Sequence, residues 1–201
     1  MEKTITDKIK HRIKVLPRGS VVVTSDFTHL ASDNTVRQIF YRLTKEDKLI
    51  TLGKGLYKKK NFNELFGQEV PVDPQLIATA YARKMNWIIY PSKNLALHSL
   101  GLSTQVPNVY TYNSNGPTTR VSFEGRELAF QHVNPRNISS QIKSNLIIEA
   151  INYLGKDSVK DEELKILSGK LTKKEYQQLK KDSQRSSEWI KNNIRKMEKY
   201  L

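Results

Sequence analysis

The chain has 201 residues, carries 34 Lys and Arg against 20 Asp and Glu, and lacks cysteine. Its length allows one large domain or two small ones, and its net charge of +14 favours nucleic acid or another polyanion as a partner. The absence of cysteine excludes disulfides, thiolate metal sites and thiol catalysis. The sequence has no secretory signal and no apolar run near ~20 residues, so we expect a cytoplasmic protein without a membrane partner.

The first thirty residues predict a helix, a strand and a second helix. Isoleucines at helical spacing predict the first helix, which Pro17 and Gly19 end. The β-branched run "SVVV" at residues 20–23 predicts a short strand. Thr24 or Ser25 is then expected to cap a second helix that reaches about residue 30.

A third helix is expected after the turn "SDN", with Asp33 or Asn34 as its cap. At about 100° per residue, one side of it is an apolar stripe made of Val36, Ile39, Phe40 and Leu43. The opposite side carries polar, aromatic and basic groups and no acid, namely Asn34, Arg37, Gln38, Tyr41, Arg42 and Lys45. A merely solvated helix more often mixes both signs of charge there. Because Arg binds phosphate or guanine and Gln pairs with adenine, this face predicts nucleic-acid contact.

The segment "KLITLGKGLYKKK" predicts two strands joined by a tight reversal at Gly53 and Gly55. Helix, strand, helix, helix and hairpin in this order form a winged helix-turn-helix pattern, in which the third helix enters the major groove and the hairpin is the wing. We therefore expect a DNA-binding domain over residues 1–62. Lys54 would lie at the wing tip, whereas the lysines at 58–60 are equally typical of a solvated linker.

A second domain is expected over residues 72–201, after the joint "NFNELFGQEVPVDP". A helix from Pro74, the strand "WIIYPS", the helix "SKNLALHSLG" and three extended segments before residue 134 predict a small α+β unit. From about residue 138, apolar stripes predict helices. The expected fold class is α+β: an N-terminal winged helix-turn-helix, a small α+β domain with antiparallel strands, and a helical C-terminal tail.

No catalytic or metal site is predicted. The four histidines lack metal-ligand spacing, and Ser99 and Ser103 lack the glycines of a nucleophile elbow. The acids at residues 161–163 lie in a polar helical run and are interpreted as solvated. The sequence gives no positive support for an enzyme, and we expect neither a cofactor nor a metal.

Two stretches carry a family signature. They are "RGSVVVTSDFTHLASDNTVRQIFYRLTKEDKLITLGKGLYKK" and, further on, "IATAYARKMNWIIYPSKNLALHSLGLSTQVPNVYTYNSNGPTTRV". Over about residues 1–135 the chain resembles the AbiEi family of antitoxins, from bacterial abortive-infection toxin–antitoxin systems. The arrangement "DF…VRQIFYRL…KLI…GKGLY" and the later "LGLSTQVP" are the most specific parts of the resemblance.

That resemblance implies a winged-helix domain that binds double-stranded DNA at inverted repeats in its own promoter and represses transcription. It also implies a C-terminal domain that antagonises a cognate toxin of the nucleotidyltransferase type, with or without stable contact. Residue by residue, it assigns DNA reading to Arg37, Gln38, Tyr41 and Arg42 and the wing role to Lys54. Together with the face of the third helix, the expected DNA contacts are Thr35, Arg37, Gln38, Tyr41, Arg42, Lys45, Lys54, Lys58 and Lys59.

The second domain offers a weaker candidate surface at loop ends, where sites tend to lie, made of Ser103, Thr104, Gln105 and Arg120. A helix exit and a turn, with polar side chains bonding the backbone, explain the same residues. Two other functions stay open: a protein-interaction module that neutralises a toxin by direct binding, with DNA binding incidental, and an RNA-processing enzyme. A homodimer or a cooperative pair would suit two-fold DNA sites.

Overall fold

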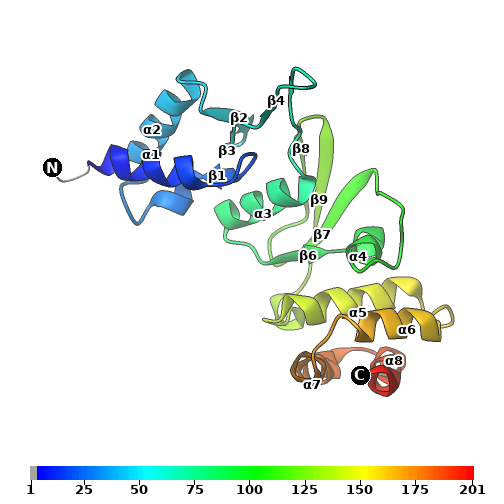
Figure 1. Cartoon of the computed structure of the whole chain (residues 1–201). Helices are drawn as coiled ribbons and strands as arrows, with labels where there is room; N and C mark the ends of the chain where they lie inside the picture. The colour runs from blue at the N-terminus through cyan, green and yellow to red at the C-terminus, as the bar shows by residue number, and fades with distance from the viewer. Residues whose placement is uncertain (1–3) are drawn as a thin grey trace. The chain divides into compact units, whose positions relative to one another are not determined.

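The computed structural model describes residues 4–201 and divides into two compact units (Figure 1). The first unit holds the chain up to Trp87 together with Ser122–Arg126, and the second holds Ile88–Val121 and Glu127–Leu201. Both units combine helices with short strands, which confirms the α+β class. Between residues 4 and 201, no helix has the length and apolar character that crossing a membrane requires.

The first unit begins with the element order of a winged helix: α1 (Ile5–Val15), β1 (Val21–Val23), η1 (Thr24–Phe27), α2 (Asp33–Lys45), β2 (Leu49–Gly53) and β3 (Leu56–Lys59). Strand β3 lies between β1 and β2 and is antiparallel to both. Amphipathic α1 and α2 pack their apolar sides against this sheet. The shared core contains Ile9, Ile13, Val22, Phe27, Val36, Ile39, Phe40, Leu43 and Leu49.

Two details of this part differ from the sequence-based expectation. The second predicted helix is wrong, because its residues form only the four-residue 3-10 helix η1. The Asp26 carboxylate accepts a hydrogen bond from the Val23 N–H at 3.0 Å, which ties η1 back to the end of β1. The cap of α2 is Ser32 rather than Asp33 or Asn34, since Ser32 Oγ accepts the Thr35 N–H at 3.3 Å.

The first unit continues beyond the expected domain boundary. After the short hairpin of β4 (Phe62–Asn63) and β5 (Gln68–Glu69), helix α3 (Pro74–Met85) packs on β1, β3 and η1. The Arg83 guanidinium of α3 donates two hydrogen bonds of 3.1 Å to the Asp26 carboxylate. Because this ion pair and the packing bind α3 to the winged helix, the helix that was expected to open the second domain belongs to the first unit.

The second unit contains a four-stranded sheet in the order β6-β7-β9-β8, whose strands are β6 (Ile89–Pro91), β7 (Val109–Ser114), β8 (Thr119–Phe123) and β9 (Arg126–His132). The tip of the β8–β9 hairpin, residues 122–126, clusters with the first unit. β6 and β7 are antiparallel as expected, but β7 and β9 are parallel. The sheet is mixed because β9, rather than β8, pairs with β7.

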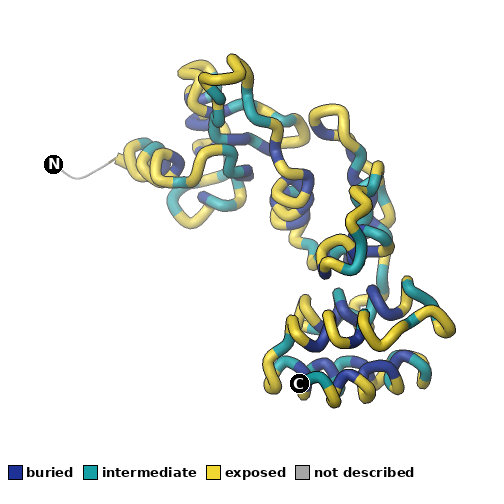
Figure 2. Tube along the Cα trace, turned by 45° about the vertical axis from the view of Figure 1, so that its right-hand side comes forward, coloured by how far each residue is buried: buried dark blue, intermediate teal, exposed yellow. Residues whose placement is uncertain are grey.

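The predicted C-terminal helices are confirmed and form a packed bundle. They are α5 (Ile142–Leu154), α6 (Asp161–Ser168), α7 (Lys173–Asp182) and α8 (Glu188–Lys196), with the 3-10 helices η2 (Pro135–Asn137), η3 (Ser183–Arg185) and η4 (Met197–Tyr200). Their core includes Ile147, Leu167 and Leu179, and it also takes in Leu97 and Leu100 at the end of α4 (Lys93–Ser99). Figure 2 shows the buried positions on the inner sides of these helices.

Candidate nucleic-acid interface

Helix α2 presents an exposed basic face because its apolar stripe is fully used in the core. Val36, Ile39, Phe40 and Leu43 are each at most 3% exposed, as the periodicity predicts. Phe40 also meets the rings of Phe27 and Tyr57 edge to face, which fixes the rotation of the helix. The residues on the opposite side are therefore turned to solvent: Asn34, Thr35, Arg37, Gln38, Tyr41, Arg42 and Lys45.

Most of this α2 face lines one hollow of about 590 Å³, formed by Asn34, Arg37, Gln38, Tyr41 and Arg42. The structure thus brings together four residues that the sequence assigned to DNA reading. Tyr41 is 62% exposed, so its ring and hydroxyl are accessible from solvent. The hollow combines cations, amides and a ring, which are the groups that contact phosphates and base edges.

The charges of this face are not all equally available. Arg37 forms an i,i+4 ion pair with Asp33 at 2.7 Å, and hydrogen bonds from Thr24 and Arg37 hold the pKa of Asp33 below its ordinary value. The Lys45 ammonium lies 5.5 Å from the centre of the Tyr41 ring. No ion pair within residues 4–201 involves Arg42. Arg42 is therefore the arginine of the α2 face whose charge is open to a ligand.

The hairpin of β2 and β3, called the wing below, is closed by Lys54 and Gly55. Both residues have positive φ, 50° and 73°, which is the backbone of a type I′ turn. Glycine adopts that conformation freely, whereas lysine adopts it at a cost. Lys54 is exposed at the tip, as the sequence predicts, and its carbonyl oxygen accepts a hydrogen bond from the Lys84 ammonium.

Lys58 does not lie where a DNA contact requires it. It points to the same side of β3 as Leu56 and is only 1% exposed. Its ammonium lies 3.3 Å from Glu69 and 3.4 Å from Glu124 and donates to the Val70 carbonyl at 3.0 Å. A buried cation is stable only when it is paired and hydrogen-bonded. We therefore remove Lys58 from the expected DNA contacts and assign it a structural role.

Lys59 is also occupied within the fold. Its ammonium donates to the carbonyl oxygens of Lys14 and Leu16, both at 2.6 Å. These carbonyls end α1, where a cation satisfies free acceptors and interacts favourably with the helix dipole. Lys59 is thus a cap of α1 rather than a free phosphate ligand. The neighbouring Lys60 pairs with Asp47.

Lys84 is a cation near the wing that sequence reasoning missed. It lies on α3, and its ammonium packs closely against Gly55 of the wing: if Gly55 had a Cβ atom, that atom would be 3.0 Å from the Lys84 Nζ. The sequence offered no signal for it, because residues 72 onward were assigned to another domain and nothing in "YARKMN" points to the wing. In the structure, Lys84 adds a second positive charge beside Lys54.

The weaker surface of the second domain shows the contacts of a turn. Ser103 Oγ accepts the backbone N–H of Gln105 at 3.2 Å, a local bond typical of hydroxyl-capped turns. Thr104 and Gln105 are exposed in the loop between α4 and β7. Arg120, on β8, pairs with Glu127 at 2.8 Å. These contacts match the structural alternative, in which polar side chains bond neighbouring groups of a turn and a strand pair.

Comparison with known proteins places the chain in a family. Residues 8–179 match DUF6088, described as a family of unknown function. The chain belongs to DUF6088. The match runs from α1 into α7, so this DUF6088 chain is covered over most of both compact units, and the residues after 179 lie outside the match. No curated protein matches the sequence.

Proposed function

We propose that the chain is a cytoplasmic repressor that binds duplex DNA through α2 and the wing. The exposed, basic side of α2 is the observation that carries the proposal: from Asn34 to Lys45 it presents no acid, while Asp33 flanks it and pairs with Arg37. An α-helix fits the major groove of B-DNA, where base edges differ in their hydrogen-bond patterns. The net charge of +14 adds general attraction to phosphates.

Each part of the interface has a distinct role in this proposal. Gln38 in the middle of α2 and Arg42 in its last turn would read base edges, and Tyr41 would contact the sugar-phosphate backbone or a thymine methyl group. Lys54 at the wing tip, with Lys84 beside it, would bind phosphates. Arg37 would exchange its partner Asp33 for a phosphate oxygen.

The resemblance to AbiEi antitoxins supports a more specific proposal. The DNA site would be inverted repeats in the chain's own promoter, and the repressor would be the antitoxin of a nucleotidyltransferase-type toxin. Two-fold repeats suit two copies of the chain, as a homodimer or as a cooperative pair. A nucleotidyltransferase-like reading frame beside this gene, whose toxicity is relieved by coexpression of this chain, would support the antitoxin role. Unrelieved toxicity would contradict it.

The DNA-binding proposal is tested by titrating the full chain against duplexes from its own upstream region and against a random duplex of equal length. We expect tighter binding of an upstream duplex and a log affinity that falls linearly with log salt. Equal affinity for both duplexes, or affinity insensitive to salt between 50 and about 200 mM, would refute the proposal.

A further inference from the structure

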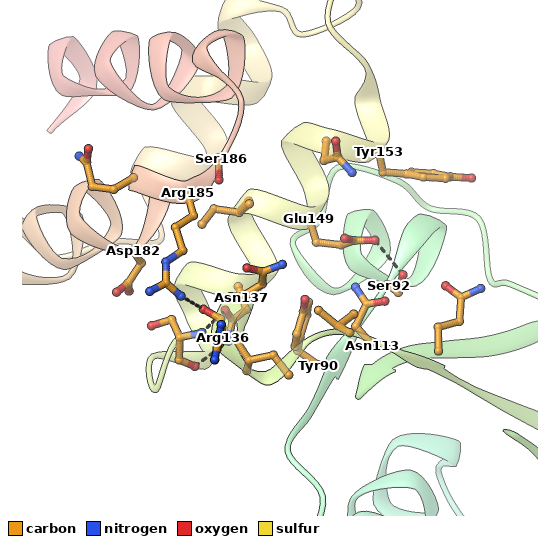
Figure 3. Close-up of a pocket in the computed structure, with 18 of the residues that line it drawn as sticks. Tyr90, Ser92, Asn113, Arg136, Asn137, Glu149, Tyr153, Asp182, Arg185 and Ser186 are labelled. Atoms are coloured by element: carbon orange, nitrogen blue, oxygen red, sulfur yellow. Dashed lines mark hydrogen bonds between the residues drawn. The ribbon is translucent and has the colours of Figure 1, made fainter. Parts of the chain in front are cut away.

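The second unit contains an open pocket of about 820 Å³ that the proposed function does not use (Figure 3). It lies where residues of β6, β7 and β9 meet α5, η2 and η3, and all its lining residues belong to the second unit. Small-molecule sites are commonly about 300–1,000 Å³. Amide side chains recur along its wall: Asn113, Gln131, Asn137, Asn145, Asn152 and Gln184.

One side of this pocket is cationic. Arg136, Lys181 and Arg185 line it, and Figure 3 shows the two arginines together there, with an N–H of Arg185 donating to the Arg136 carbonyl. None of the ion pairs formed by the described part of the chain involves these three side chains. Asp182 is the acid on this side, and one of its oxygens accepts from Gln178 at 2.8 Å. Three cations against one acid favour an anionic group such as phosphate.

The other side is built around a fixed carboxylate. Glu149 Oε1 accepts hydrogen bonds from Ser92 Oγ at 2.7 Å and from the Lys93 N–H at 3.0 Å. Figure 3 shows Glu149 with Ser92 and Asn113 on the side away from Arg136 and Arg185. Burial, and then the charge of Glu149, raises the pKa of Tyr90 to about 12, so its hydroxyl stays protonated. A carboxylate repels phosphate and accepts hydrogen bonds from amino groups.

We propose that this pocket binds a nucleotide whose base carries an amino group, with the base on the Glu149 side and the phosphates against Arg136, Lys181 and Arg185. Arg136, Lys181 and Arg185 gather cations on one side, whereas Glu149 supplies an acceptor on the other, where Lys93 also lines the pocket. The two sides therefore fit a ligand that is anionic at one end and a hydrogen-bond donor at the other. Asn145 is buried and bonded through both ends of its amide to the Ser139 backbone, so the other amides supply the donors and acceptors for base edges. The half-exposed Tyr153 ring offers a stacking surface. The ligand is a free nucleotide or the terminal nucleotide of an RNA strand, because both present this chemistry.

Calorimetric titration of the full chain with ATP, CTP, GTP, UTP and inorganic tripolyphosphate tests the inference. Uracil lacks an amino group, so we expect at least one of the other three nucleotides to bind about tenfold more tightly than UTP and tripolyphosphate. RNA hexamers that end in the preferred base or in uridine separate the two sources: a hexamer that binds more tightly than the free nucleotide assigns the site to RNA ends. No saturable binding of any nucleotide or hexamer, or equal binding of all of them, would overturn the inference.

Variants locate the binding in this pocket. Arg136→Ala and Lys181→Ala should each weaken nucleotide binding about tenfold. Lys174→Ala is the matched control, because Lys174 is an exposed lysine of the same helix as Lys181 and does not line the pocket. Glu149→Gln should reduce the preference over UTP while binding is retained. If the first two variants bind like the control, the pocket is not the site.

The nucleotide proposal and the DNA-binding proposal can be tested independently of each other. The pocket variants should bind upstream duplexes like the wild type, since no pocket residue lies on α2 or the wing. A chain that binds nucleotide but shows no duplex preference would refute the DNA proposal alone. A chain that prefers its upstream duplex but binds neither nucleotide nor hexamer would refute this inference alone.

Discussion

Four lysines within seven residues of the chain have four different environments. Lys54 is exposed at a turn, Lys58 is buried between two glutamates, Lys59 caps a helix, and Lys60 forms a surface ion pair. An ammonium in water contributes to the field around the protein, whereas a buried one is committed to its partners. The effect of removing each lysine therefore depends on its neighbours.

Lys54→Ala and Lys60→Ala distinguish a phosphate contact from a surface charge. We expect Lys54→Ala to weaken duplex binding and to reduce the slope of log affinity against log salt by about 0.9, because one phosphate contact is lost. Lys60→Ala should leave that slope unchanged, since Lys60 is held by Asp47. Fluorescence anisotropy at four or more salt concentrations measures both. Equal losses for the two variants would argue against the geometry of the wing.

Lys58→Met should destabilise the fold without changing the DNA-binding surface. It leaves Glu69 and Glu124 together without their cation, and we expect the free energy of unfolding to fall by about 3 kcal/mol. Urea denaturation provides the measurement. Lys60→Met is the control and should cost less than about 1 kcal/mol, because its ion pair is at the surface. Adding Glu69→Gln and Glu124→Gln to Lys58→Met should restore part of the loss; no recovery would contradict the pairing.

The burial of Lys58 was only partly predictable from the sequence. Side chains alternate along a strand, so extending β3 beyond Leu56 places Lys58 on the inner side. Its two acid partners could not be inferred, because Glu69 is 11 residues away and Glu124 is 66 residues away, beyond any local pattern. Lys59 is similar, since its acceptors are backbone carbonyls that sequence patterns do not show.

At the scale of elements, α2 was predictable because its own residues determine it. Its stripe of Val36, Ile39, Phe40 and Leu43 repeats at helical spacing, and this alone fixes the opposite face. The 3-10 helix η1 was not predictable, because Arg83 of α3 holds Asp26 from a distant part of the chain. The pocket of the second unit was missed for the same reason: it is assembled from helices, strands and loops far apart in sequence.

Arg42→Ala tests whether α2 reads bases. We expect the preference for the upstream duplex over a random one to fall about tenfold, because a bidentate base contact is worth about 1–3 kcal/mol. Arg37→Ala is the comparison on the same helix, and it should weaken both duplexes more evenly, since Arg37 is assigned to phosphate. Competition binding with the two duplexes gives the ratio. A ratio unchanged by Arg42→Ala would exclude base reading by this side chain.

The start of α7 should make the stability of the helical bundle depend on acid pH. Hydrogen bonds from Lys143 of α5, and then from Thr172, lower the pKa of Glu175 from 4.5 to about 2. A carboxylate with a depressed pKa in the folded state stabilises the protein above the unfolded pKa, and this contribution is lost as pH falls from about 4.5 to about 2.

Glu175→Gln is the corresponding variant. The wild type should have the higher urea midpoint at pH 6, and the difference should shrink as pH falls toward about 2. Glu162→Gln, an exposed acid in the first turn of α6, is the control and should follow the wild type more closely. A difference between wild type and Glu175→Gln that does not change with pH would contradict the ion pair as its cause.

At the scale of the whole molecule, the chain passes between the two compact units three times, because residues 122–126 return to the first unit. Glu124 in that segment supports Lys58 and also accepts the Val72 N–H at 3.1 Å. The winged helix is therefore completed by residues that lie about sixty positions after it. The sequence predicted a separable domain of residues 1–62. It could not show that this domain depends on α3, Glu69 and Glu124, because those contacts join residues far apart in the chain.

Fragments of the chain test this dependence. A fragment of residues 1–62 lacks α3, Glu69 and Glu124, and we expect it not to unfold cooperatively. A fragment of residues 1–87 keeps α3 and Glu69 and should fold with a lower melting temperature than the first unit in the full chain. Thermal melts followed by circular dichroism give the comparison. A fragment of 1–62 as stable as that of 1–87 would show that α3 is dispensable.

The left-handed backbone of Lys54 has a consequence for how stability and binding are balanced in the wing. Asparagine fits the first position of an Asn-Gly type I′ turn far better than lysine does. Lys54→Asn should therefore raise the free energy of unfolding by about 0.5–1 kcal/mol while it weakens duplex binding. A variant with higher stability and weaker duplex binding would show that lysine at position 54 is retained for binding, although it lowers the free energy of unfolding.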